Sequence, residues 1–82
     1  MVMDLCNILG EIVEEIRFDF MYKGNCISIA RSKMLCGSSV VDIYGYDNVA
    51  DYMYKRLCVG DIVFVYGRVS KLGILCKYIL KV

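Results

Sequence analysis

The chain has 82 residues, which is enough for one domain with one hydrophobic core and excludes a second domain. Ten lysines and arginines against nine aspartates and glutamates give a net charge of +1, so no overall field draws the protein to nucleic acid or to anionic lipid. Apolar residues make up 59% of the chain, which predicts that another subunit covers part of the apolar surface.

The sequence predicts neither a transmembrane segment nor a signal peptide. No apolar run approaches the roughly 18 residues that span a bilayer. The N-terminus also lacks the basic segment and apolar stretch of a signal peptide. We therefore expect an intracellular, cytoplasmic protein without a membrane partner.

Five cysteines occur at positions 6, 26, 36, 58 and 76, with no C-x-x-C pair and no histidine in the chain. This pattern predicts no zinc or other metal site. Cys6, Cys26 and Cys76 fall in strand-like runs, where a free thiol packs as a small apolar group. A disulfide or redox role is the alternative, and a reducing cytosol disfavours it.

The first half of the chain has the alternating pattern of β-strands. It predicts a strand over residues 5–13 and a second extended segment over residues 16–22. Residues 23–25 supply a turn, because Gly and Asn adopt positive φ at low cost, and a strand resumes over residues 26–31. Residues 32–39 contain a Gly-Ser-Ser run and are predicted to be a loop.

The spacing of apolar residues changes from that of a strand to that of a helix after residue 46. Residues 40–46 are β-rich and form the third predicted strand. Asp47 is then the predicted cap of a helix of about ten residues that Gly60 ends. One face of this helix carries its apolar residues, namely Val49, Ala50, Met53 and Leu57.

Two further strands complete the chain. Residues 62–69 and 74–82 are both strand-like, with a tight turn over residues 70–73 between them. In the last strand, Cys76, Tyr78 and Leu80 are expected on one face, and Lys77, Ile79 and Lys81 on the other.

This order predicts an all-β fold, a single oligonucleotide-binding (OB) domain over residues 1–82. Such a domain is a five-stranded barrel with one short helix between strands 3 and 4. Gly10, Gly45 and Gly67 interrupt otherwise good strands. Barrels need such positions where a strand bends sharply or another backbone approaches closely.

Residues 40–69, VVDIYGYDNVADYMYKRLCVGDIVFVYGRV, resemble the bacterial single-stranded DNA-binding protein family, SSB. The family pattern is a strand ending in an aromatic residue, an alanine on a short helix, a glycine, and then apolar-x-apolar-x-Gly-x-apolar. The matching residues are Tyr46, Ala50, Val59, Gly60, Val63, Val65, Gly67 and Val69. The opening and the second-strand segment of the family are matched by Cys6, Ile8, Gly10, Ile12, Ile27, Ile29 and Ala30.

The resemblance implies a protein that holds single-stranded DNA in replication, recombination or repair. The chain differs from the family in having no tryptophan, a short loop between the last two strands and no acidic recruiting tail. A plasmid, phage or mobile-element relative, or a replication-restart accessory protein, therefore fits better than the housekeeping form. The alternative function is an OB-fold adaptor for a helicase, primase or polymerase with weak nucleic-acid binding. RNA binding is a third possibility.

Single-strand binding needs rings on which bases stack and cations that follow phosphates. Tyr46 matches the family's stacking aromatic, and Tyr44 shares its strand face if Val41 and Ile43 point inward. The alternative for both rings is packing beneath a loop or another subunit. The other predicted nucleic-acid-binding residues are Phe20, Tyr22, Arg31, Lys33, Arg68 and Lys71.

Phe64 and Tyr66 alternate with Val63 and Val65, so both faces of that strand are apolar. We therefore predict a homodimer or homotetramer whose interface includes Phe64 and Tyr66. The chain has neither histidine nor the glycine motifs of nucleotide-binding enzymes, and its adjacent Glu14 and Glu15 diverge along a strand. We expect no catalysis and no cofactor.

Overall fold

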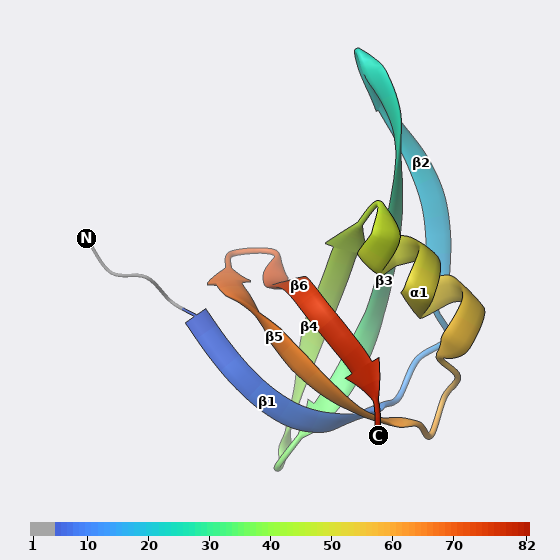
Figure 1. Cartoon of the computed structure of the whole chain (residues 1–82). Helices are drawn as coiled ribbons and strands as arrows, with labels where there is room; N and C mark the ends of the chain where they lie inside the picture. Colours follow the sequence, from blue (N-terminus) through green and yellow to red (C-terminus); the bar gives the residue numbers. More distant parts are fainter. Residues whose placement is uncertain (1–4) are drawn as a thin grey trace.

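The computed structural model describes residues 5–82, without the side chain of Lys23. These residues form six strands and one helix (Figure 1). In chain order the elements are β1 (Leu5–Ile12), β2 (Arg17–Lys23), β3 (Asn25–Cys36), β4 (Ser39–Tyr46), α1 (Asn48–Arg56), β5 (Ile62–Ser70) and β6 (Gly73–Lys81). Within this range no helix is long and apolar enough to cross a membrane.

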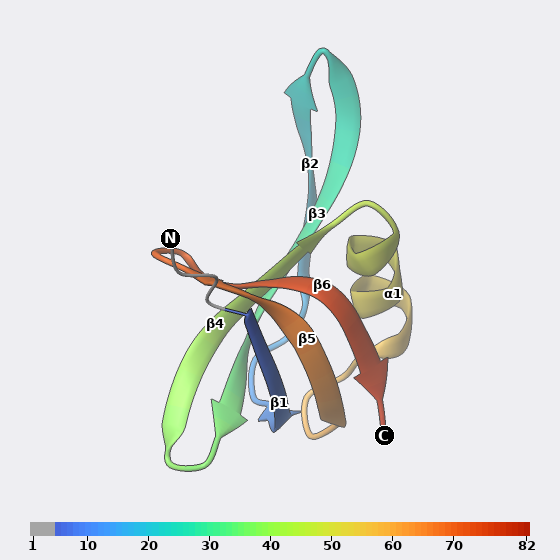
Figure 2. The same cartoon turned by 60° about the vertical axis from the view of Figure 1, so that its left-hand side comes forward.

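The strands form one sheet that closes on itself. Their order is β1-β5-β6-β4-β3-β2, and β1 also pairs with β3 through Glu11 with Leu35 and Ile12 with Met34. The pair β4 and β6 is parallel, and the other pairs are antiparallel. The closure produces a five-stranded barrel with β2 outside it, so the β2–β3 hairpin projects beyond the barrel (Figures 1 and 2).

The predicted all-β, five-stranded barrel is confirmed, but the predicted helix position is wrong, and one strand outside the barrel was not counted as such. The extended segment over residues 16–22 is a full strand, β2, so there are six strands and the helix lies between β4 and β5. The predicted loop over residues 32–39 is also wrong, because β3 continues to Cys36 and a two-residue turn follows. Polar Ser32 concealed the alternation: it is buried, and its hydroxyl donates to the Glu14 carbonyl at 2.6 Å.

The barrel is filled by side chains from the strands and capped by α1. The helix packs against β3, β4 and β6. Its predicted apolar face is present, because Ala50, Met53 and Leu57 are buried and Val49 is half-buried. Gly60 does not end the helix; it lies in the following turn, where its N–H donates to the Ile12 carbonyl at 2.8 Å.

A bulge reverses the faces of β6 half-way along the strand. Tyr66 pairs with Tyr78 while Gly67 pairs with Cys76, which leaves Lys77 without a partner. Ile74 and Cys76 therefore point inward before the bulge and Ile79 after it. The predicted shared face of Cys76, Tyr78 and Leu80 is wrong, since Tyr78 and Leu80 lie on the outer surface.

The cysteine predictions are borne out in part. All five thiols are free. Cys76 is buried in the core and Cys6 packs against it, as expected, but Cys26 is exposed on the β2–β3 hairpin. Cys26 lies in the part of the β2–β3 hairpin that extends past the barrel, where neither face of the hairpin is covered by the rest of the protein.

Burial raises the pKa of the Cys76 thiol from 9.0 to about 12, with a backbone hydrogen bond from Tyr44 opposing the shift and nearby Cys6 adding to it. Above pH 9 the unfolded chain loses this proton while the folded chain keeps it. Stability should therefore fall between about pH 9 and pH 12, by roughly 1.4 kcal/mol per pH unit from this group. Urea unfolding across the range should show a flatter dependence for Cys76→Ala, and identical slopes would contradict the assignment.

Asp47 joins β4 to α1 in a strained conformation, with φ 54° and ψ −122°. This region is comfortable only for glycine. The predicted side-chain cap is absent, although the Asp47 carbonyl accepts a hydrogen bond from the Asp51 N–H at 2.9 Å. Asp47→Gly should therefore raise the free energy of unfolding by about 1 kcal/mol. Urea unfolding measures the gain, and Asp47→Ala, which keeps the Cβ, should show none.

Candidate nucleic-acid interface

The outer surface of β4 presents a row of polar and aromatic side chains. Ile43 and Gly45 point inward and are buried, so Asp42, Tyr44 and Tyr46 point outward. This is the orientation that the alternation in the sequence predicts. Both tyrosine rings are half-buried, while Asp42 is exposed.

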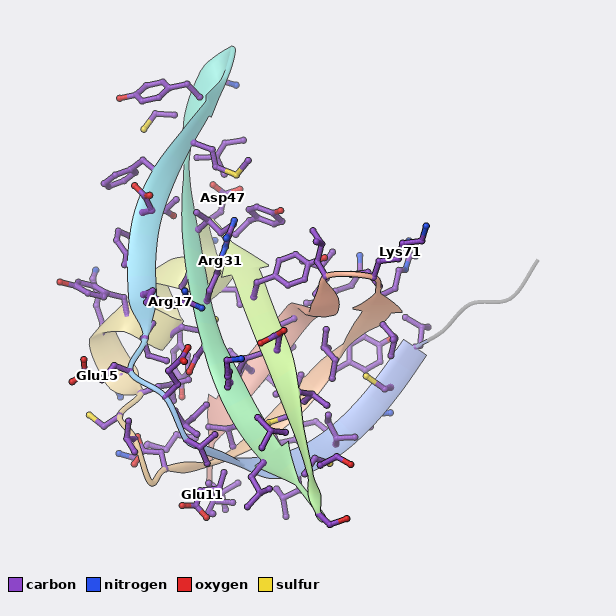
Figure 3. The ribbon with its side chains drawn as sticks, turned by 180° about the vertical axis from the view of Figure 1, so that it is seen from behind. Glu11, Glu15, Arg17, Arg31, Asp47 and Lys71 are labelled. Atoms are coloured by element: carbon purple, nitrogen blue, oxygen red, sulfur yellow. The ribbon has the colours of Figure 1, made fainter. Side chains whose placement is uncertain are left out.

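Each residue in this row has a partner on β3 that points the same way. Ile29 lies opposite Tyr46, Arg31 opposite Tyr44 and Lys33 opposite Asp42. On the next strand, Arg17 lies opposite Arg31. Figure 3 shows the two arginines side by side on this surface.

These side chains line an open groove of about 370 Å³ across β2, β3 and β4. Leu72, in the β5–β6 turn, forms part of its wall, and so does Glu14, just before β2. We call this the β3–β4 groove. It is partly open to solvent.

The two tyrosines pack edge to face. Their ring centroids are 5.9 Å apart and their planes meet at 87°. The Tyr44 hydroxyl is 2.9 Å from the Ser70 hydroxyl, which ties this ring to the last residue of β5. Because the planes are perpendicular, the rings offer two separate stacking surfaces.

Ion pairs neutralise most of the positive charge in the groove. Lys33 Nζ is 3.3 Å from Asp42 Oδ1, and Arg17 Nη2 is 3.3 Å from Glu14 Oε1. In the described part of the chain no hydrogen bond or ion pair holds Arg31. Three cations against two carboxylates leave one excess positive charge. The exposed pairs are worth about 0 to 1 kcal/mol each, so a phosphate can displace either carboxylate.

The fold is shared with solved structures of known proteins. The SSB domain of a protein from Synechococcus sp. has a TM-score of 0.80 and 17% identity, covering 96% of each chain. A small single-stranded DNA-binding protein from Streptomyces coelicolor has a TM-score of 0.74 and 16% identity, covering 100% of this chain and 94% of that one. The mitochondrial single-stranded DNA-binding protein Rim1 from S. cerevisiae has a TM-score of 0.78 and 13% identity, covering 100% and 97%.

The chain has the fold of single-stranded DNA-binding proteins. The predicted resemblance to the SSB family is thereby confirmed at the level of the fold. No protein-family model matches the sequence, and no curated protein matches it either.

The SSB-type barrel separates the predicted aromatic residues into two groups. Phe20 and Tyr22 lie on the opposite face of β2 from the groove, and their side chains are 57% and 79% exposed. Phe18 shares that face, with its ring centroid 5.4 Å from Phe20 and 4.6 Å from Tyr54 of α1. The β3–β4 groove therefore brings together Arg31, Lys33, Tyr44 and Tyr46 but neither Phe20 nor Tyr22, although Phe20 lines a second hollow that Arg17 and Arg31 also line.

The predicted cations of the last hairpin lie beside the groove and do not line it. Lys71 projects from the tip of the β5–β6 turn (Figure 3), next to Leu72 in the groove wall. Arg68 is exposed on β5, between Leu5 of β1 and Leu75 of β6.

The sequence reasoning missed three charged residues of the groove, Glu14, Arg17 and Asp42. Asp42 could have been found, because it shares the outward period of Tyr44 and Tyr46. Arg17 could not, since its place depends on the register of the β2–β3 hairpin, which sets it opposite Arg31.

The outer face of β1, β5 and β6 is apolar around Phe64, with Asn7 and Arg68 as polar members, and it contains both predicted interface residues. Phe64 lies between Leu9 and Leu80, which are 58% and 45% exposed. Tyr66 lies next to Tyr78, which the bulge in β6 places on this side. We call this surface the β1–β5–β6 face.

Proposed function

We propose that the protein binds single-stranded DNA in the β3–β4 groove, without catalysis, in replication, recombination or repair. The observation that carries the proposal is the cross-strand pair of Tyr44 and Arg31, a flat ring beside a cation with no competing partner in the described chain. A base stacked on such a ring is worth about 1 to 3 kcal/mol. The guanidinium is well suited to phosphate oxygens. The fold of proteins described as single-stranded DNA-binding supports the proposal.

In this proposal the bound strand lies across β3 and β4. Bases stack on Tyr46 and on the free face of Tyr44, while Arg31, Arg17 and Lys33 contact phosphates. Lys71, at the rim, and Arg68, on β5, contact the backbone where the strand continues past the β5–β6 turn. The protein acts in the cytoplasm, where a reducing environment suits five free thiols.

A titration with fluorescent oligothymidine at several salt concentrations tests the function. Release of about 0.7 counterion per phosphate contact predicts a log–log salt slope of about −2 for an oligonucleotide short enough to engage only the three groove cations. An RNA oligonucleotide of matching length is the comparison. Absence of binding, or binding independent of salt, would refute the proposal, and tighter binding of RNA would assign the groove to RNA.

We propose that a second copy of the chain covers the β1–β5–β6 face, in a homodimer or homotetramer. The face exposes Leu9, Leu80 and Tyr78 around Phe64, and contiguous exposed apolar side chains of this kind are typical of subunit interfaces. Sedimentation at micromolar concentration should show a dimer or larger. Phe64→Glu should yield a folded monomer, and Tyr54→Glu, on an exposed helix position, should not change the mass.

A monomeric wild-type protein in that experiment would reject the oligomer. The same face would then be available to a replication protein such as a helicase or primase, as an adaptor requires.

A further inference from the structure

Two carboxylates lie in a groove proposed to hold a polyanion. Asp42 and Glu14 both line the β3–β4 groove, and the side chain of Asp42 is 58% exposed. A carboxylate repels a phosphate at short range, so these groups weaken backbone binding wherever a phosphate approaches them. Beyond their ion pairs with Arg17 and Lys33, these carboxylates can favour binding only by meeting a different part of the nucleotide, which is the base.

Asp42 stands where the edge of a stacked base would lie. It precedes Tyr44 by two residues on the same outward face of β4. Successive side chains on one face of a strand are about 7 Å apart, roughly the width of a nucleobase. A base stacked on Tyr44 thus directs one edge toward Asp42, while Arg31 lies beside the ring on the neighbouring strand β3.

Glu14 supplies an independent sign of unused acceptor capacity. Its Oε1 is shielded from solvent and makes no hydrogen bond, although Arg17 Nη2 is 3.3 Å away. An ionised carboxylate offers about four acceptor sites, and one cation uses only part of them. Asp42 likewise has one cation partner, Lys33, but its side chain is exposed to solvent.

Carboxylates distinguish bases by the hydrogens on their edges. An ionised carboxylate only accepts hydrogen bonds. Cytosine offers the N4 amino group, a donor that Asp and Glu recognise in known complexes, and adenine offers N6. Thymine offers carbonyl oxygens on both sides of its single N3–H, and these oxygens repel a carboxylate.

We propose that Asp42, assisted by Glu14, makes the β3–β4 groove selective for bases that carry an exocyclic amino group, cytosine foremost, over thymine. The inference rests on the proposed function. When DNA binds, Lys33 moves from Asp42 to a phosphate, and the freed carboxylate accepts from the cytosine amino group. Asp42 thus pairs with Lys33 in the free protein and with the cytosine amino group in the complex.

Competition between oligodeoxycytidine and oligothymidine of equal length, at mildly alkaline pH, tests this selectivity. The wild-type protein should bind oligodeoxycytidine about 5- to 10-fold more tightly, toward the lower end of what one base contact provides. In Asp42→Asn the ratio should fall to about 1, because an amide can donate to thymine as well as accept from cytosine. Glu14→Gln should lower the ratio by a smaller factor.

Glu15→Gln is the matched control. It removes the same charge from the neighbouring residue, which is exposed and does not line the groove, so the ratio should stay at the wild-type value. Equal affinity of the wild-type protein for both oligonucleotides would overturn the selectivity and leave DNA binding intact. A ratio that survives in Asp42→Asn would overturn the role of this residue. Absence of binding to both would instead reject the proposed function.

Discussion

Tyr46→Ala is expected to weaken the binding of a single-stranded oligonucleotide about 5- to 150-fold, which corresponds to the roughly 1 to 3 kcal/mol of one stacked base. Tyr46 lies opposite Ile29 and is held edge to face by Tyr44, so its ring is preorganised and little side-chain entropy is lost on stacking. Fluorescence anisotropy with an oligonucleotide short enough to occupy only the groove measures the loss.

Tyr46→Phe is the matched control, since it keeps the ring and should retain most of the affinity. Phe20→Ala tests the other face of β2. It should leave the short oligonucleotide unaffected, and a loss seen only with longer DNA would show that the strand passes over the β2 edge to Phe20 and Tyr22. Unchanged affinity in Tyr46→Ala would remove this ring from the site.

Gly67→Ala is expected to destabilise the fold by about 3 kcal/mol, the upper range for overpacking in a core. A Cβ at this position would overlap the backbone carbonyl of Leu75 in the neighbouring strand. Backbone cannot rotate away as a side chain does, so β5 and β6 would have to separate beside the bulge. Urea unfolding gives the difference in the free energy of unfolding.

Gly24→Ala provides the comparison. Gly24 has φ +80° in the β2–β3 turn and open space around it, so an added Cβ meets only local strain of about 1 kcal/mol. If Gly67→Ala does not yield folded protein, Gly10→Ala extends the test, because its Cβ would meet Met34 and the Leu35 carbonyl. A smaller effect at Gly67 than at Gly24 would contradict the packing described for the barrel.

The sequence predicted the direction of side chains correctly in β4 and α1, elements that bury only one face. The alternation in β4 predicted the outward direction of Tyr44 and Tyr46, and the helical spacing predicted burial of Ala50 and Met53. Each of these patterns is local, because the period of the backbone decides which side chains share a face.

Features set by pairing between strands could not be read in the same way. The bulge at Lys77 depends on how β6 aligns with β5, and it moves Tyr78 to the outer surface. Phe20 and Arg31 are both predicted nucleic-acid-binding residues, yet the pairing of Phe20 with Ser28 places it on the other face of the hairpin from Arg31. Their residue types alone do not tell which face each one takes.

The position of β2 outside the barrel closure makes the hairpin a separable part of the molecule. No strand pair of the closed barrel involves β2, so residues can be added or removed near the tip without opening the barrel. Only even changes on each strand preserve the face of every side chain, because a single residue exchanges the two faces. Evolution, or an engineer, can therefore lengthen this hairpin in two-residue steps and extend the surface beside the groove while the barrel stays constant.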